Sequence, residues 1–171
     1  MKNAEGKPFT FDILLAAGAS DSEAVVNIYV EALRLLGITP TVTSVDGPQY
    51  KERTNTYAFD MAWYTRSLSL SPGNEQTLYW GSQGITEPGS RNWMGMNSPA
   101  AEAMIATMVN SADPADFTAA TQALDRILLA GRYVIPVWYS KVSRMAHTKH
   151  LHHPEKLPLY GDWPGFQPEV W

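Results

Sequence analysis

Cysteine is absent from the 171 residues. Its absence excludes disulfides, thiolate metal sites, iron–sulfur clusters and cysteine nucleophiles. No apolar run approaches the roughly 20 residues that a helix needs to cross a bilayer, and the first ten residues lack the apolar core of a secretion signal. Lys and Arg form no run, and the net charge is −4. The sequence therefore predicts no nucleic acid partner and no basic membrane-binding patch.

Catalytic and cofactor motifs are also missing. The sequence has no P-loop and no G-x-G-x-x-G fingerprint. The string GSQG at residues 81–84 lacks the spacing of a hydrolase nucleophile elbow. Glu75 and Glu102 have no obvious carboxylate partner. Because covalent hydrolysis needs a nucleophile and a base, we expect no enzyme activity and no cofactor.

The composition that remains is typical of a globular protein. Hydrophobic residues make up 44% and charged residues 18%, which is enough apolar material for a core. The length suits one domain or one lobe of a larger protein. Six Trp and eight Tyr are many for this length, and such side chains are common in ligand clefts and interfaces as well as cores.

The first 65 residues alternate between strand and helix patterns. Period-two alternation and β-branched runs predict strands over residues 9–16, 38–45 and 59–64. A capping box that begins at Ser20 predicts the first helix, which Gly37 ends, and Asp46 is predicted to cap a second helix that reaches about residue 57. The face of the first helix that we expect to be buried consists of Val25, Ile28, Ala32 and Leu35.

This order predicts an α/β fold in which helices flank the sheet and right-handed crossovers join the strands. The third strand is apolar enough to lie inside the sheet. Residues 67–97, rich in Ser, Gly, Pro and Asn, are predicted to form a long, packed loop. Helices are expected from Ser98-Pro99 and from Asp113, with an edge strand at residues 133–139 and a polar tail after them.

Ligands of open α/β sheets bind beyond the carboxyl ends of strands, so the end of the third strand is the candidate site. Trp63 and Tyr64 point in opposite directions along a strand, so only one of them can face a cleft. Arg66 and Arg91 are suited to hold a carboxylate. The full set of candidate ligand-binding residues is Trp63, Tyr64, Thr65, Arg66, Ser69, Asn74, Arg91, Asn92 and Trp93.

Four histidines lie close together, at His147, His150, His152 and His153. Imidazoles bind zinc or nickel, and three that converge would form a site. Their spacing matches no zinc motif, and the segment has no helical or strand periodicity. We interpret it as a polar surface segment and predict no metal ligand in the chain.

Several strings resemble the C-terminal part of the family 5 extracellular solute-binding proteins of ABC importers, with the Yej-type oligopeptide and microcin C proteins as the nearest subgroup. They are SLSPGNEQ at 69–76, YWGS at 79–82, PGSRN at 88–92, AATQALDR at 119–126, YVIPVW at 133–138 and PEKLP at 154–158. The resemblance implies the type II (cluster C) periplasmic-binding-protein fold, in which two lobes close on the ligand. Residues 1–140 would then be an incomplete second lobe, and residues 141–171 a hinge crossover and a tail that belongs to the first lobe.

The resemblance also implies a function. The chain would help to capture oligopeptides or peptide-like solutes in the periplasm and deliver them to a membrane permease, and its signal sequence would lie outside the 171 residues. Arg66 stands about where relatives place an acid for the peptide ammonium group, which favours an acidic ligand group here. Binding of a metal chelate or a sugar by the same scaffold, and peptide hydrolysis, are the alternatives. A lobe that lacks its counterpart would expose apolar surface, so a dimer through that face is expected.

Overall fold

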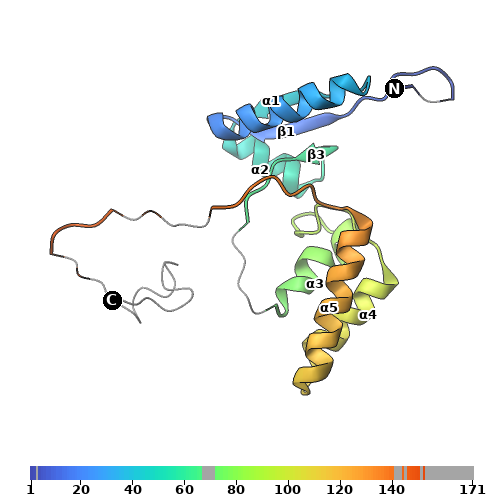
Figure 1. Cartoon of the computed structure of the whole chain (residues 1–171), viewed down its shortest axis with the longest axis vertical. Coiled ribbons are helices and arrows are strands. Elements are labelled where there is room, and N and C mark those ends of the chain that lie inside the picture. Colours follow the sequence, from blue (N-terminus) through green and yellow to red (C-terminus); the bar gives the residue numbers. More distant parts are fainter. Residues whose placement is uncertain (3, 67–71, 141–143, 145, 151, 153–171) are drawn as a thin grey trace. The chain divides into compact units, whose positions relative to one another are not determined.

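The computed structural model describes residues 1–2, 4–66, 72–140, 144, 146–150 and 152 (Figure 1). The chain divides into two compact units, and the boundary between them lies between Tyr133 and Val134. All the helices and strands that the structure describes belong to the first unit.

A parallel sheet with the strand order β2-β1-β3 forms the first part of this unit. Its strands are β1 (Asp12–Ala16), β2 (Thr41–Val45) and β3 (Met61–Ala62), and Ile13 lies opposite both Val42 and Met61. The predicted alternation of strands and helices is confirmed, but each strand is shorter than predicted. Pro40 has no N–H for the ladder, so β2 begins after it. The third strand is an outer strand of the described sheet rather than an inner one.

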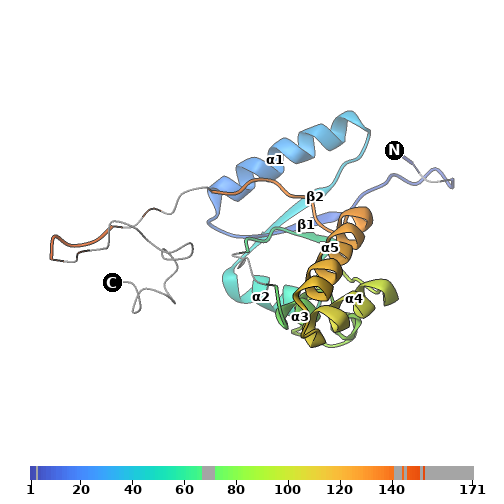
Figure 2. The same ribbon diagram turned by 60° about the horizontal axis from the view of Figure 1, so that its bottom comes forward.

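Helix α1 (Ser20–Leu35) packs on one face of the sheet, and helix α2 (Gly47–Asn55) lies on the other side (Figures 1 and 2). Val26 and Val30 of α1 form a core with Ile13 and Leu15 of β1. Leu14 points to the opposite face and is completely buried. The first core of the unit therefore lies between α1 and the central strand.

The predicted buried face of α1 is wrong. The buried residues are Val26, Val30 and Leu33, whereas Ile28 is 72% and Leu35 89% exposed. Apolar residues occur on two sides of this helix, and the side that meets Ile13 and Leu15 is the one that is buried. The capping box is also wrong, because Ala19 is the N-cap and no side chain caps the helix.

Other local signals for helix ends are confirmed. Gly37 has a φ of 73°, and its N–H donates to the carbonyl of Arg34 while the N–H of Ile38 donates to that of Leu33. This is the Schellman pattern that glycine favours at a helix C-terminus. Asp46 caps α2 through a 2.9 Å hydrogen bond from the N–H of Gln49.

The second part of the unit is helical, although a long loop was predicted for residues 67–97. Within that range lie α3 (Glu75–Trp80) and the short 3-10 helix η1 (Ser82–Ile85), and the Ser, Gly, Pro and Asn that suggested a loop lie mostly outside these two helices. Helices α4 (Pro99–Asn110) and α5 (Pro114–Gly131) follow as predicted and lie side by side (Figures 1 and 2). Their caps are Ser98 and Asp113. The second core consists of Trp80, Met96, Ala101, Ile105 and Leu124.

The strand predicted at residues 133–139 is not present. Val134, Ile135 and Val137 are all more than half exposed, and residues 134–140 pair with no strand in the part of the chain that the structure describes. Pro136 offers no N–H for a ladder, which disfavours pairing of this apolar run as a strand. Of the helices that the structure describes, none is long and apolar enough to cross a membrane.

Candidate functional site: an arginine and aromatic cluster beyond strand β3

Trp63 and Tyr64 directly follow strand β3, and their side chains point in opposite directions. The N–H of Trp63 still donates to the carbonyl of Leu14, and the Trp63 side chain packs against the core of Ile13, Leu15, Val26 and Val30. Tyr64 is 48% exposed and lies edge-on to Trp93, with the ring centroids 4.6 Å apart. Of the two aromatic residues at the end of the strand, Tyr64 is therefore the one that faces outward.

Arg66 follows and lies flat against the second part of the unit. Its guanidinium carbon is 3.0 Å from the centroid of the Tyr79 ring. The Nε and Nη2 atoms of Arg66 are buried and have no hydrogen-bond partner. Burial lowers the pKa of Arg66, and the neighbouring Tyr79, Tyr64 and Glu75 oppose that shift. The contact that holds the Arg66 side chain in place is therefore its stacking on the Tyr79 ring.

Tyr79 also holds a second arginine. Arg91 Nη1 donates a 2.9 Å hydrogen bond to the Tyr79 hydroxyl, and its guanidinium carbon is 5.7 Å from the centroid of the same ring. This hydrogen bond raises the pKa of Arg91. One tyrosine of α3 therefore brings together two cations that are far apart in the sequence.

Glu75 is the acid that influences this cluster. Its Oε1 accepts hydrogen bonds from the N–H of Gly73, at 2.9 Å, and from the side-chain amide of Gln76, at 3.0 Å. Burial alone would raise the pKa of Glu75, but these bonds, its own backbone N–H and the charge of Arg66 together lower it. Among the residues described, neither Arg66 nor Arg91 has a carboxylate within ion-pair distance.

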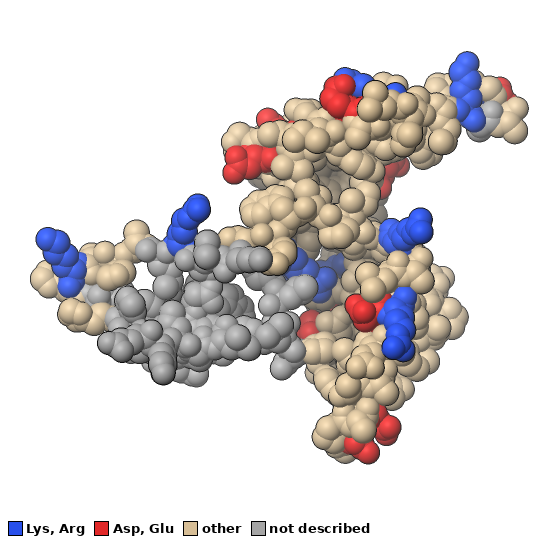
Figure 3. All heavy atoms as spheres, viewed as in Figure 1, with Lys and Arg blue, Asp and Glu red and all other residues tan. Residues whose placement is uncertain are grey.

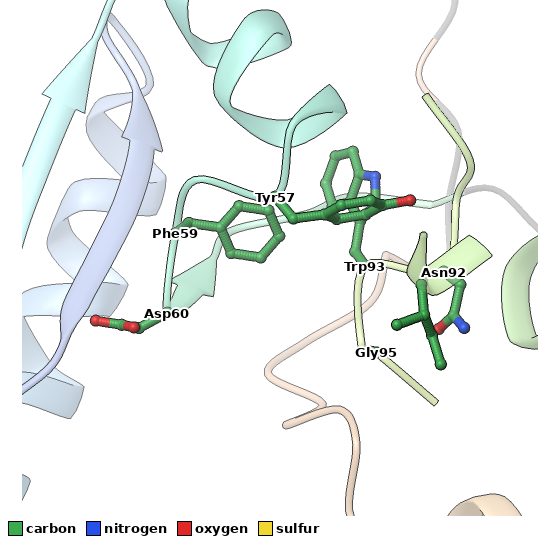
Figure 4. Close-up of a pocket in the computed structure, with 7 residues that line it drawn as sticks. Tyr57, Phe59, Asp60, Asn92, Trp93 and Gly95 are labelled. Atoms are coloured by element: carbon green, nitrogen blue, oxygen red, sulfur yellow. The ribbon is translucent and has the colours of Figure 1, made fainter. Parts of the chain in front are cut away.

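Trp93 connects this cluster to a small pocket. Its ring centroid is 6.1 Å from that of Phe59 and 6.4 Å from that of Tyr50. The pocket encloses about 220 Å³, and Figure 4 shows Tyr57, Phe59 and Trp93 grouped around it, with the Asp60 carboxylate turned away from the rings. That carboxylate accepts a 2.9 Å hydrogen bond from the N–H of Asp12. The lining residues are Tyr57, Phe59, Asp60, Ile85, Asn92, Trp93 and Gly95.

Asn92 has a structural role in this loop. The side chain is 1% exposed, and Nδ2 donates to the carbonyls of Gly81 and Met96 while Oδ1 accepts from the N–H of Met96, all within 2.8 to 2.9 Å. The amide that was expected to contact a ligand is therefore fully engaged by backbone groups. A Cβ on Gly84 would come within 2.6 Å of the Asn92 Cβ, so this turn requires glycine.

The remaining candidates are dispersed. Thr65 and Asn74 are exposed, and Asn74 is the N-cap of α3 without capping it through its side chain. Ser69 and His153 lie outside the described residues. Among the residues that are described, no group of three His, Asp or Glu side chains is placed to hold a metal ion. On the face shown in Figure 3, basic and acidic side chains are scattered among uncharged ones.

The site that emerges contains four of the predicted residues: Tyr64, Arg66, Arg91 and Trp93. Tyr79 and Glu75 were not among the residues that the sequence predicted to bind ligand. Tyr79 follows the SPGNEQ string by only a few residues, yet its contacts with both arginines bridge three separate segments, and no local pattern predicts such a meeting.

Comparisons with known proteins place these features in a wider context. No family model matches the chain. An uncharacterized protein of Sinorhizobium fredii is 42% identical over the whole chain and over 25% of its own length. The “Probable peptide-binding protein YejA” of Agrobacterium fabrum is 36% identical over 98% of the chain and 26% of its own length. The “Peptidoglycan-binding protein YepA” of the same organism is 33% identical over the whole chain and 27% of its own length.

Solved structures agree on the fold. A periplasmic oligopeptide-binding protein of Thermotoga maritima, solved with mannohexaose bound, has a TM-score of 0.72 at 22% identity and covers 81% of this chain and 26% of its own. The oligopeptide-binding protein AppA of Bacillus subtilis, in complex with a nonapeptide, has a TM-score of 0.67 at 19% identity, covering 75% of this chain and 25% of its own. The predicted fold class is confirmed.

The chain thus spans about a quarter of the length of the curated relatives it matches. Its described part has the fold of the oligopeptide-binding proteins of ABC transporters. The chain is thus similar along its whole length to a part of relatives that include a probable peptide-binding protein YejA, and its described residues have the fold of oligopeptide-binding proteins.

Proposed function

We propose that this chain forms part of a receptor that captures peptides or peptide-like solutes and hands them unaltered to the membrane permease of an ABC importer. The main support for this proposal is the cluster beyond the carboxyl end of β3, which consists of Tyr64, Arg66, Tyr79, Arg91 and Trp93. Ligands of open α/β sheets bind at this edge. The names of the relatives, which include peptide-binding and peptidoglycan-binding proteins, agree in kind with such a receptor.

The receptor would work by closing its two lobes around the ligand, without a covalent change to the ligand. In this proposal residues 1–140 belong to the second lobe and residues 141–171 form the hinge crossover and a tail packed on the first lobe. Hinge closure around the ligand produces the form that the permease recognises. The receptor would act in the periplasm, as the similar oligopeptide-binding protein of Thermotoga maritima does.

The ligand would be gripped partly by its backbone. Extended peptides are held through main-chain hydrogen bonds, and ordered water in roomy pockets lets different side chains fit. A single lobe offers only part of those contacts, so we expect the 171-residue chain alone to bind ligand weakly or not at all. On its own it would also associate through exposed apolar side chains such as Ile28 and Leu35 of α1.

A sugar is the second candidate ligand. The pocket beside Trp93 is lined by three aromatic rings, which are suited to stack on a sugar face, and the Thermotoga structure was solved with mannohexaose bound. In this case the aromatic pocket rather than the arginines would supply most of the binding surface.

Native mass spectrometry separates these candidates. The purified chain is mixed with an equimolar set of peptides and oligosaccharides, and the retained species are released and weighed. We expect retained peptides with unchanged masses. Retention of oligosaccharides alone would favour the second candidate, and peptides cleaved by the wild-type chain would contradict binding without chemistry. Because a single lobe offers only part of the contacts, the same measurement is made on the full-length two-lobed receptor, and retention of neither class by that receptor would contradict the receptor function.

A further inference from the structure

We propose that Arg66, supported by Arg91, forms a subsite for an anionic ligand group of the carboxylate type. The inference rests on the proposed receptor function and names the class of ligand that this receptor takes: solutes that carry an acidic group at the end bound near β3.

The first observation is the state of the Arg66 guanidinium group. Nε and Nη2 are buried and donate no hydrogen bond. Buried polar atoms nearly always have a partner, and a buried charged donor without one is costly to the fold. An arrangement of this kind is expected where the acceptor comes from another molecule.

The second observation is which atoms lack a partner. Nε and Nη2 lie on the same edge of the guanidinium plane, and their N–H bonds form the fork that accepts both oxygens of a carboxylate. The face of the same group is occupied by Tyr79, 3.0 Å from the guanidinium carbon to the ring centroid. The stacked ring therefore orients the group and leaves its bidentate edge unused.

The third observation is the balance of charge. Arg91 is joined to the same tyrosine by a 2.9 Å hydrogen bond, so two positive groups adjoin one ring. Glu75 influences Arg66 but engages Oε1 with Gly73 and Gln76, and the described residues place no carboxylate within ion-pair distance of either arginine. An added anion would meet an uncompensated positive charge.

Access to the fork requires a small rearrangement. Arg66 is held by stacking on Tyr79, without a hydrogen bond from Nε or Nη2 that would have to break. Rotation of the Arg66 side chain would break its stacking on Tyr79, and the two charge-assisted hydrogen bonds to a carboxylate would offset that loss. Binding should accordingly change the surroundings of both Arg66 and Tyr79.

Carboxylates and phosphates can both accept hydrogen bonds from an arginine fork, so the experiment compares ligands that carry each group. The side-chain Nε–Hε resonances of the labelled 171-residue chain are followed by NMR during titration with acetylated, amidated tripeptides. One peptide carries a central glutamate, one a central glutamine and one a central phosphoserine. A fourth probe is the glutamine peptide with a free terminal carboxylate, and a fifth is inorganic phosphate.

We expect the glutamate or the terminal-carboxylate peptide to shift the Arg66 resonance saturably, with an affinity about 10–100-fold above that of the neutral peptide, the range for charge-assisted hydrogen bonds. R66Q should abolish this difference. R66K, which keeps the charge but loses the fork, should retain only part of it, and R91Q should reduce it. R126Q, on the exposed side of α5, is the matched control and should change nothing.

Charge reversal provides an independent check. R66D should move the preference toward a neutral peptide with a free ammonium group. Equal affinity for the glutamate and glutamine peptides in the wild-type chain, with Arg66 unmoved, would overturn the subsite and leave the receptor function standing. Tightest binding by phosphoserine or inorganic phosphate would assign the subsite to phosphate. If no peptide and no anion moves Arg66, the subsite is refuted irrespective of what else the chain binds.

Discussion

The side chain of Asn92 donates a 2.9 Å hydrogen bond to the backbone carbonyl of Gly81. This bond joins two of the strings on which the family resemblance was based, YWGS at residues 79–82 and PGSRN at residues 88–92. Ser90 of the second string donates to the carbonyl of Gly84 and pairs with the hydroxyl of Tyr57 at 2.6 Å. These hydrogen bonds join the two strings, and Arg91 and Trp93 lie in the loop that they hold.

Removal of the Asn92 amide should weaken the fold strongly. Asn92→Ala leaves the N–H of Met96 and the carbonyls of Gly81 and Met96 without their partners in a buried place. We expect a loss of about 3 kcal/mol in the free energy of unfolding, since each abandoned buried group costs roughly 1–3 kcal/mol and the losses overlap. Urea denaturation measures it. A loss below about 0.5 kcal/mol, the size of an ordinary surface substitution, would contradict the assigned role.

Gly84→Ala tests the close approach within the same loop. The new Cβ would come within 2.6 Å of the Asn92 Cβ and would clash with Ser90, so the loop must shift and we expect destabilisation of about 1–3 kcal/mol. Gly47→Ala is the matched control, because Gly47 opens α2 and nothing lies within 4 Å of its added Cβ. Thermal unfolding should show a lower Tm for the first variant and an unchanged or slightly higher Tm for the second. Equal Tm values would mean that the glycine is not required.

Two substitutions on opposite sides of α1 test which face of the helix packs on the sheet. Val30→Ala removes two buried carbon atoms from the core beside Ile13 and Leu15, which costs about 2 kcal/mol. Ile28→Ala removes apolar surface that is 72% exposed and should change the free energy of unfolding by less than about 0.5 kcal/mol. The reverse order, measured by chemical denaturation, would support the face predicted from the sequence.

Glu75 makes the stability of the chain depend on acid pH. Its folded-state pKa lies below the ordinary value of 4.5, so the ionised carboxylate stabilises the fold above that value. This contribution is lost as the pH falls through the folded-state pKa. Compared with Glu75→Gln, the wild type should therefore be more stable at neutral pH, and the difference should shrink in acid. A difference in Tm that stays constant from neutral pH to below the folded-state pKa would contradict the assigned hydrogen bonds.

Local chemistry made several elements predictable from the sequence. Asp46, Asp113 and Ser98 each supply an oxygen that a helix start needs, and Gly37 takes the left-handed conformation at a helix end. These features depend on residues only a few positions apart. The alternation of Trp63 and Tyr64 is equally local, and the structure places one inward and one outward.

Features set by tertiary packing were not predictable in this way. Apolar residues lie on two sides of α1, and only the position of β1 decides between them. The apolar run at residues 133–139 reads as a strand, but a strand also needs a partner, and the described residues supply none. Likewise Arg66 and Arg91 were proposed separately, whereas their common contact with Tyr79 depends on three segments folding together.

The most direct test of the receptor function is a map of ligand contacts on the chain. Backbone and indole resonances of the 171-residue chain are recorded by NMR as an acidic peptide is added, and the peptide is recovered and weighed afterwards. We predict saturable shifts that centre on Tyr64, Arg66, Tyr79, Arg91 and Trp93, with the peptide mass unchanged. Shifts that centre on α1, α4 or α5 instead of this cluster, or recovery of a cleaved peptide, would contradict the receptor function.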